Sequence, residues 1–161
     1  MKISYKVLTG EHSEQYRALR LQSLKLYPEA FCAVYAEQVQ LEKLYFQQLM
    51  EDDVQEHFMF GAFDDQQLVG LCGLITNTQR LLKAAEIIQM YINKDYRRLG
   101  IGLALISQVL DTVKARKLTD IVLLEVLKDN SSAYEAYLKA GFRVNEKLSD
   151  PEISWIMEIK V

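Results

Sequence analysis

Proline, glycine and cysteine are scarce in this chain of 161 residues, which has two prolines, seven glycines and two cysteines. So few prolines and glycines exclude a collagen-like or low-complexity chain. The two cysteines, Cys32 and Cys72, do not make a disulfide framework, and Cys72 lies in an apolar run. Both are therefore predicted to be buried thiols of a reducing compartment, which favours a cytoplasmic protein.

Long apolar runs and a strong excess of one charge are also absent. No stretch approaches the ~18 apolar residues that a membrane span needs, and residues 1–7 alternate apolar and polar side chains, unlike a signal peptide. The net charge of −3 argues against a dedicated nucleic-acid-binding protein, which carries a basic excess. The sequence thus predicts no nucleic-acid partner and no membrane partner, and it leaves a homodimer open.

Half of the residues are hydrophobic, which is enough for a core without metals or disulfides. Without repeats or a linker, residues 1–161 are expected to form a single domain. The apolar patterns predict strands at 1–7, 58–63, 68–75, 85–92, 121–127, 142–147 and 153–160, and helices from Ser13 to before Pro28 and at 36–50, 100–117 and 130–140. This order predicts an α/β (α+β) fold with a mixed, mostly antiparallel central sheet of about seven strands flanked by about four helices.

The most informative segment is the glycine-containing loop 97–102 (Arg-Arg-Leu-Gly-Ile-Gly), between a predicted strand and a predicted helix. The first turn of a helix has unpaired backbone N–H groups and a partial positive charge. Glycines there remove side chains that would keep an anion from those donors. Lys94, Arg97 and Arg98 add positive charge beside them. The segment predicts a site for a phosphate-bearing ligand.

Three kinds of phosphate-binding loop compete for this segment. A Walker loop needs Gly-Lys-Ser/Thr, which residues 101–103 do not supply. A dinucleotide fingerprint needs a third glycine where Leu105 stands, and it places its first glycine directly after the strand. A site for the pyrophosphate of coenzyme A is the third. A helix start with a solvated basic turn would also explain the two glycines.

Two ordered segments resemble the motifs of the GNAT N-acetyltransferase superfamily. The first is the strand at 85–92 followed by the loop 97–102, which matches Gln/Arg-x-x-Gly-x-Gly/Ala. The second has Asn130, an alanine three residues later, Tyr137 and a final Gly141-Phe142. The predicted elements match the family's order over essentially the whole chain. The resemblance implies transfer of an acetyl group from acetyl-CoA to an amine, on a small molecule or a protein, by direct attack in a ternary complex. A non-catalytic acyl-CoA-binding sensor is the alternative.

The resemblance also implies which residues hold acetyl-CoA. In this family a strand separates from its neighbour at a bulge, and its free N–H groups receive the pantetheine arm and the thioester carbonyl. By position these N–H groups belong to Gln89, Met90, Tyr91 and Ile92, whose side chains are interpreted as packing. The pyrophosphate would be held by the N–H groups of Arg97, Arg98, Leu99, Gly100, Ile101 and Gly102. Asn130 would contact the cofactor arm, and it also suits a helix N-cap.

Acetyl transfer also needs a base for the amine proton and a donor for the leaving thiolate. Tyr137 matches the family's thiolate-protonating tyrosine, although its helical face would also suit core packing. Two glutamates compete for the base. Glu86 lies where protein lysine acetyltransferases of the superfamily carry theirs, and Glu125 has the spacing of bacterial N-terminal-alanine acetyltransferases. A carboxylate in an apolar strand also needs hydrogen-bonding partners, so either could be structural. We favour Glu86.

Two further segments carry weaker signals. His12 and His57 are isolated from other ligand-type residues, so no metal is predicted. Residues 27–31 fall where this family lines the acceptor pocket, but a turn anchored by Phe31 would explain them equally well.

Overall fold

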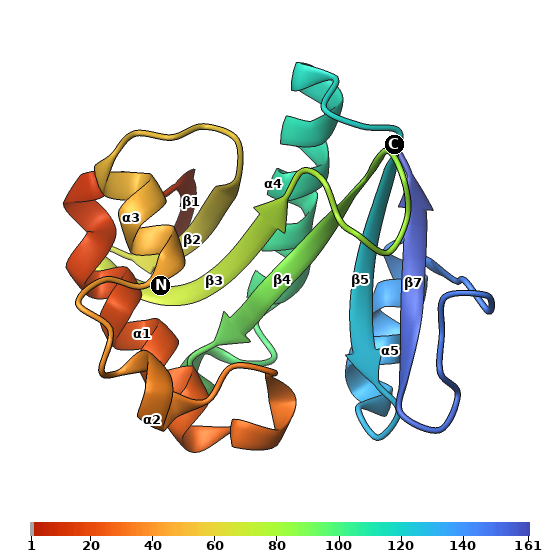
Figure 1. Cartoon of the computed structure of the whole chain (residues 1–161), viewed down its shortest axis with the longest axis horizontal. Helices are drawn as coiled ribbons and strands as arrows, with labels where there is room; N and C mark the ends of the chain where they lie inside the picture. The colour runs from red at the N-terminus through yellow and green to blue at the C-terminus, as the bar shows by residue number, and fades with distance from the viewer. Residues whose placement is uncertain (1) are drawn as a thin grey trace.

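The computed structural model describes residues 2–161, and its centre is a seven-stranded sheet in the order β1-β2-β3-β4-β5-β7-β6 (Figure 1). The strands are β1 (Ile3–Val7), β2 (Phe58–Asp64), β3 (Gln67–Ile75), β4 (Ala84–Ile92), β5 (Ile121–Leu127), β6 (Arg143–Val144) and β7 (Ser154–Lys160). Of these neighbours β4 and β5 are parallel, and the other pairs are antiparallel. The predicted mixed sheet is confirmed.

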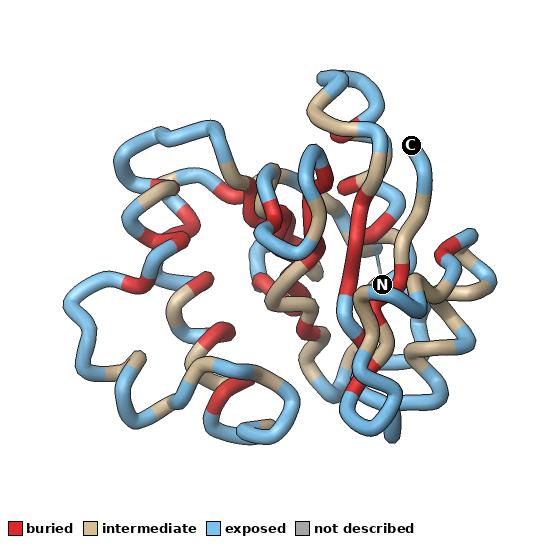
Figure 2. The backbone as a smooth tube through the Cα atoms, turned by 45° about the vertical axis from the view of Figure 1, so that its right-hand side comes forward, coloured by how far each residue is buried: buried red, intermediate tan, exposed pale blue. Residues whose placement is uncertain are grey.

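Helices cover both faces of this sheet. The α-helices are α1 (Ser13–Leu26), α2 (Tyr35–Gln38), α3 (Tyr45–Glu51), α4 (Ile101–Arg116) and α5 (Ser131–Lys139), and 3₁₀ turns form at η1 (Gly10–His12), η2 (Pro28–Ala30) and η3 (Lys94–Tyr96). One hydrophobic cluster joins α1 and α3 to β2 and β3, and a second joins α4 to β2–β5. Buried residues, which are red in Figure 2, accordingly gather in the middle of the molecule, and exposed residues lie mostly on the outer loops. Within residues 2–161, no helix is both long and apolar enough to cross a membrane.

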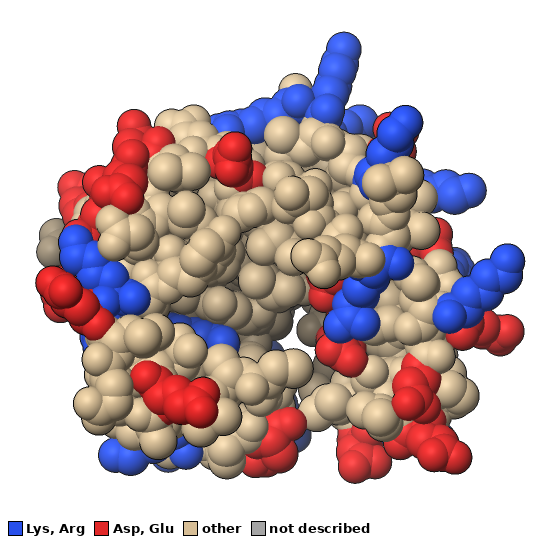
Figure 3. All heavy atoms as spheres, viewed as in Figure 1, with Lys and Arg blue, Asp and Glu red and all other residues tan. Residues whose placement is uncertain are grey.

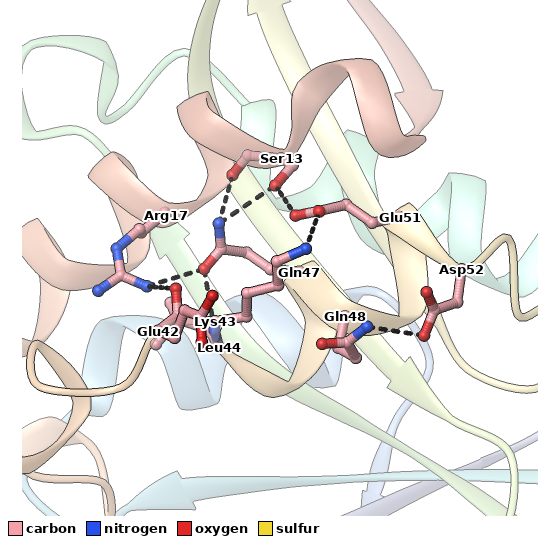
Figure 4. A network of polar contacts seen from close by, with 9 residues as sticks. All are labelled: Ser13, Arg17, Glu42, Lys43, Leu44, Gln47, Gln48, Glu51 and Asp52. Carbon is pink, nitrogen blue, oxygen red and sulfur yellow. Dashed lines mark hydrogen bonds and ion pairs between the residues drawn. The ribbon is translucent and has the colours of Figure 1, made fainter.

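The helix predicted at 36–50 is wrong in its middle, where the chain leaves the helix between α2 and α3. Arg17 on α1 explains the break, because its guanidinium donates to the carbonyls of Val39, Leu41 and Glu42 at 2.8–3.3 Å. The Gln47 side chain then caps the new helix start by accepting from the Leu44 N–H at 2.8 Å. Figure 4 shows the part of this network that Arg17, Glu42, Leu44 and Gln47 form between α1 and α3. Tertiary hydrogen bonds have replaced those of a continuous helix.

Two other expectations differ from the structure. The strand predicted at 142–147 is limited to Arg143–Val144, because the side chain of Asn145 accepts from the Leu148 N–H and starts a turn. Cys72 is buried as predicted, whereas Cys32 is exposed, because it follows the surface turn η2 instead of lying in a strand. The predicted helix N-cap at Asn130 is confirmed, and Gly141, just after the same helix, has a φ of 107°.

His12 makes the stability of the fold depend on pH. Burial and the nearby Lys6 lower its pKa, partly offset by Glu11, and its Nδ1 accepts from the Thr9 N–H at 2.9 Å. The unfolded chain binds this proton more readily than the folded one, so stability is fully present above pH ~6.5 and falls as the pH drops towards the folded pKa. Thermal unfolding between pH 7.5 and 5.5 should show this fall, and His12→Asn should flatten it; an unchanged slope in His12→Asn would assign the pH dependence elsewhere.

Candidate active site

The centre of the sheet opens where β4 and β5 separate. The two parallel strands pair only at residues 84–86 with 121–123. Beyond Glu86, β4 remains paired with β3, and β5 remains paired with β7. In Figure 1 the strands start together near the C-terminus and diverge towards the lower edge of the view. The backbone groups of β4 that face this gap have no neighbouring strand.

A bulge in β4 lies beside this gap. The register passes from Gly73↔Ile88 to Leu71↔Tyr91, so two residues of β4, Gln89 and Met90, lie opposite one residue of β3. Gln89 has a φ of 55°, which is rare for a residue with a side chain. Its side-chain oxygen accepts a 2.6 Å hydrogen bond from the buried Tyr16 hydroxyl. This bond from α1 helps to hold the bulge in place.

Free backbone donors line the loop at the end of β4. The first hydrogen bond of α4 runs from the Ala104 N–H to the Gly100 carbonyl at 3.0 Å. Within residues 2–161, no N–H from Arg98 to Leu103 donates to a protein acceptor. These N–H groups sit at the positive end of a helix of 16 residues. The arrangement is that of an anion-binding site.

Gly100 and Gly102 have different reasons to be glycine. Gly100 has a φ of +78°, which glycine adopts without strain. Gly102 is helical, and a methyl group there would meet nothing closer than Ile92 Cγ1 at 4.0 Å. Folding therefore does not require glycine at 102, since alanine would favour the helix. The bare backbone instead leaves room over the free N–H groups, as a bound pyrophosphate would need.

The basic side chains of this loop are not equivalent. The Arg97 Nε donates to the Ile92 carbonyl at 3.0 Å. Its guanidinium carbon lies 4.8 Å from the ring centre of Tyr27 and 5.8 Å from that of Tyr91. The positive charge of Arg97 is thus turned towards the α1 side, and Arg98 stays exposed.

Glu86 and Glu125 are brought together at the point where the strands separate. Arg80, on the loop before β4, donates to both oxygens of Glu86 at 3.1 and 3.2 Å and to Glu125 at 3.2 Å. The Thr78 hydroxyl donates to Glu86 at 2.6 Å, and the Ser154 hydroxyl donates to Glu125. The sequence did not identify these three donors, because Thr78 and Arg80 lie on the loop before β4 and Ser154 begins β7, so none of them belongs to either motif. The two carboxylates and one guanidinium form a unit of net charge −1.

Tyr137 lies on α5, on the other side of the gap. Its ring centre is 6.2 Å from that of Phe142. Burial, with a smaller effect of Cys72, raises the pKa of Tyr137 to about 12. The phenol therefore remains a proton-bearing donor across the physiological range. Asn130, at the start of the same helix, caps it by accepting from the Ala133 N–H at 3.3 Å.

These groups line one cavity of about 490 Å³. Its walls are formed by residues 30–33 and Arg20 from the α1 side, by Arg80, by 86–90 of β4, by 124–127 of β5, and by Asn130 and Tyr137. The space-filling view shows a cleft between the part that contains α1 and α2 and the part that contains β5 and β7 (Figure 3). Both glutamates and Tyr137 thus share a cavity with the bulge. The donor-rich loop 97–102 follows the same strand.

Across residues 2–161, no three His, Cys, Asp or Glu side chains gather as a metal site would require.

Comparison with known proteins identifies the family. The model of the acetyltransferase (GNAT) family matches residues 19–142. The chain belongs to this family.

Individual relatives agree with the family assignment. An uncharacterized N-acetyltransferase of Methanocaldococcus jannaschii is 31% identical over 144 residues, which cover 85% of this chain and 60% of the relative. Among solved structures, the PaiA N-acetyltransferase of Thermoplasma acidophilum, in complex with coenzyme A, is 24% identical with a TM-score of 0.77 over 100% of both chains. A GNAT-family acetyltransferase of Streptococcus pneumoniae is 15% identical with a TM-score of 0.80 over 99% of both. The two structures show that the GNAT fold is shared.

Proposed function

We propose that this GNAT-family chain transfers an acetyl group from acetyl-CoA to an amine in a ternary complex. The observation that carries the proposal is the run of free N–H groups from Arg98 to Leu103, which follows β4 after the turn η3. The gap-facing edge of β4 is itself unpaired beyond Glu86. The free N–H groups of the loop suit a pyrophosphate, and the unpaired edge of β4 suits an extended arm that contains amides. Acetyl-CoA has both parts and brings the activated acetyl group.

The chain's own residues would bind the two ends of this co-substrate differently. The N–H groups of 98–102 would hold the pyrophosphate, with Gly102 leaving the space that it needs. The Arg97 N–H, expected to join them, donates instead to the Lys94 carbonyl at 3.5 Å. The backbone of 89–92 would receive the arm and donate to the thioester oxygen as it gains charge. Asn130 faces the same cavity, and its side chain would reach the arm from the β5 side.

The carboxylate unit would prepare the acceptor. Its net negative charge favours an incoming ammonium group, which must lose a proton before nitrogen can attack. In the proposed step the nitrogen forms a bond to the acetyl carbon while the carbon–sulfur bond breaks. The ammonium first gives one proton to solvent, and the second proton leaves the nitrogen as the carbon–nitrogen bond forms and passes to Glu86, directly or through water. Glu125 shares Arg80 with Glu86 and would act with it.

Tyr137 would stabilise the leaving thiolate. A thiol has a pKa of about 8.5, against about 12 for this phenol. Complete proton transfer from Tyr137 to the thiolate would therefore be uphill by roughly 5 kcal/mol, at ~1.4 kcal/mol per pKa unit. We infer that Tyr137 donates a hydrogen bond to the sulfur while charge develops, and that the proton released by the amine finally neutralises the thiolate.

Substitution of Gly102 tests the proposed phosphate site. Gly102→Ala should raise the free energy of unfolding by about 0.5–1 kcal/mol, because alanine suits a helix better than glycine. The same methyl group should weaken acetyl-CoA binding about 10-fold, and Gly102→Leu should weaken it further. Calorimetric titration with acetyl-CoA and thermal unfolding measure the two effects.

The control is Ser107→Ala, an exposed position of the same helix, which should stabilise the protein without changing its affinity for acetyl-CoA. Retained affinity in Gly102→Leu would place the phosphate site elsewhere. Release of thiol from acetyl-CoA in the presence of varied amines tests catalysis itself. Tight binding without transfer to any amine would instead favour a sensor.

A further inference from the structure

The guanidinium of Arg20 is buried without a partner. Arg20 lies on α1 and is 7% exposed, and its Nη1 is buried and makes no hydrogen bond. Within residues 2–161, none of its N–H groups is paired with a carboxylate or another protein acceptor. Its guanidinium carbon lies 4.9 Å from the ring centre of Phe31. The ring faces the cation but offers no hydrogen-bond acceptor.

The other arginines around this site are better satisfied. Arg17, three residues earlier on α1, donates to carbonyls and to Gln47. Arg80 is paired with two carboxylates, and Arg97 donates to a carbonyl. A buried cation without acceptors is costly, and burial lowers the pKa of Arg20, partly offset by Tyr16. A ligand that brings hydrogen-bond acceptors to Arg20 would offset this cost.

The position of Arg20 indicates that use. It lines the same cavity as Glu86 and Glu125, on the α1 wall beside Phe31 and Cys32. The carboxylate unit has a net charge of −1, and Arg20 supplies +1. The cavity is therefore bipolar, with formal charges that sum to zero. A ligand with one positive and one negative group would match both ends, whereas a simple diamine would leave Arg20 unpaired.

We propose that the acceptor is a small amine that carries a carboxylate, and that this carboxylate binds Arg20. The inference rests on the proposed acetyl transfer and specifies its substrate class. A carboxylate accepts two parallel hydrogen bonds from the guanidinium fork, and its single charge balances the single charge of Arg20. The burial of Arg20 inside a cavity of about 490 Å³ favours a compact molecule over an extended chain.

Matched acceptors test this substrate class. Glycine, β-alanine and 4-aminobutyrate are each compared with their carboxamides as acceptors of acetyl groups from acetyl-CoA. For the acid of best length we expect kcat/KM to exceed that of its amide about 30-fold, as for the loss of a charge-assisted hydrogen-bond pair. Arg20→Met should reduce this ratio to about one. Arg20→Lys should retain only part of it, because lysine lacks the fork.

Arg116→Met is the matched control. The guanidinium carbon of Arg116 also lies over a phenylalanine ring, 5.0 Å from the centre of Phe58, but Arg116 does not line this cavity. This variant should keep the acid-to-amide ratio of the wild type. Unchanged acetyl-CoA affinity in Arg20→Met, measured by titration calorimetry, shows that the variant is folded.

The outcomes separate this inference from the proposed function. Acetylation of amines without preference for acids, or a preference that survives Arg20→Met, overturns the role of Arg20 and leaves acetyl transfer standing. A wild-type protein that neither binds acetyl-CoA nor transfers its acetyl group overturns the proposed function. If acetyl-CoA binds but no amine reacts, the CoA complex is titrated with N-acetyl-β-alanine and with its amide. Binding of the acid that does not depend on Arg20 overturns the inference. Faster acetylation of peptides with an acidic second residue would overturn the small-molecule class.

Discussion

Replacing Glu86 by glutamine is expected to lower kcat/KM for the amine about 1,000-fold at neutral pH, within the range typical of a lost general base. Glutamine keeps the shape of the side chain, and its oxygen can still accept from Thr78 and from the Arg80 Nε. The change removes the proton acceptor together with the negative charge that pairs with Arg80. Acetyl-CoA affinity should stay within a few-fold of the wild type. Steady-state kinetics with a saturating cofactor measure the first effect, and calorimetric titration measures the second.

Glu125→Gln is the comparison that separates the two glutamates. Glu125 shares Arg80 with Glu86, but its side chain is 34% exposed against 9% for Glu86. We expect Glu125→Gln to lower kcat/KM about 10-fold, and the double variant to be scarcely slower than Glu86→Gln, because groups that act as a unit are not additive. A larger loss in Glu125→Gln than in Glu86→Gln would assign the base to Glu125.

Replacing Tyr137 by phenylalanine is expected to lower kcat about 100-fold with little change in acetyl-CoA affinity. The change removes the hydroxyl that Tyr137 brings to the cavity from α5 and leaves its ring packed against Phe142. Because burial raises the pKa of Tyr137 to about 12, its protonated form persists throughout the assay range. The wild-type kcat should therefore show no loss between pH 8.5 and 10 from this group.

Tyr134→Phe provides the control for this change. Tyr134 lies one turn earlier on α5, with its ring centre 6.3 Å from that of Trp155, and it does not line the cavity. Its substitution should leave kcat within about two-fold of the wild type. Equal rates for Tyr137→Phe and the wild type would make Tyr137 a packing residue.

The parts of the fold that the sequence predicts best are those with strong local patterns. The strand at 121–127 and the helix that follows the glycine loop are found almost to the residue, because apolar periodicity and glycine placement act locally. The predicted helix at 36–50 fails for the opposite reason. Its interruption depends on Arg17, more than twenty residues away, and no local pattern carries that information.

The candidate site divides in the same way. Loop 97–102, Asn130 and Tyr137 belong to contiguous motifs, so the order of the amino acids is enough to propose them as candidate site residues. Arg80 and Arg20 are ordinary arginines in the sequence. Only the folded chain shows that Arg80 bonds Glu86 and that Arg20 lines the same cavity. The family resemblance implies a bulge in this strand, but no local pattern places it at Gln89, because the left-handed backbone there is supported by a hydroxyl from α1.

The short pairing between β4 and β5 also has a mechanical meaning. Only residues 84–86 and 121–123 join the two halves of the sheet by strand hydrogen bonds, while each half is paired over much longer stretches. The sheet therefore consists of two stiff halves joined by a short strand pairing, and the unpaired edges of β4 and β5 both border the cavity. A molecule that fills the cavity contacts both halves of the sheet at once and restricts their relative motion. Substrate binding and product release are therefore expected to act on the β4–β5 pairing, whose last residue pair contains Glu86.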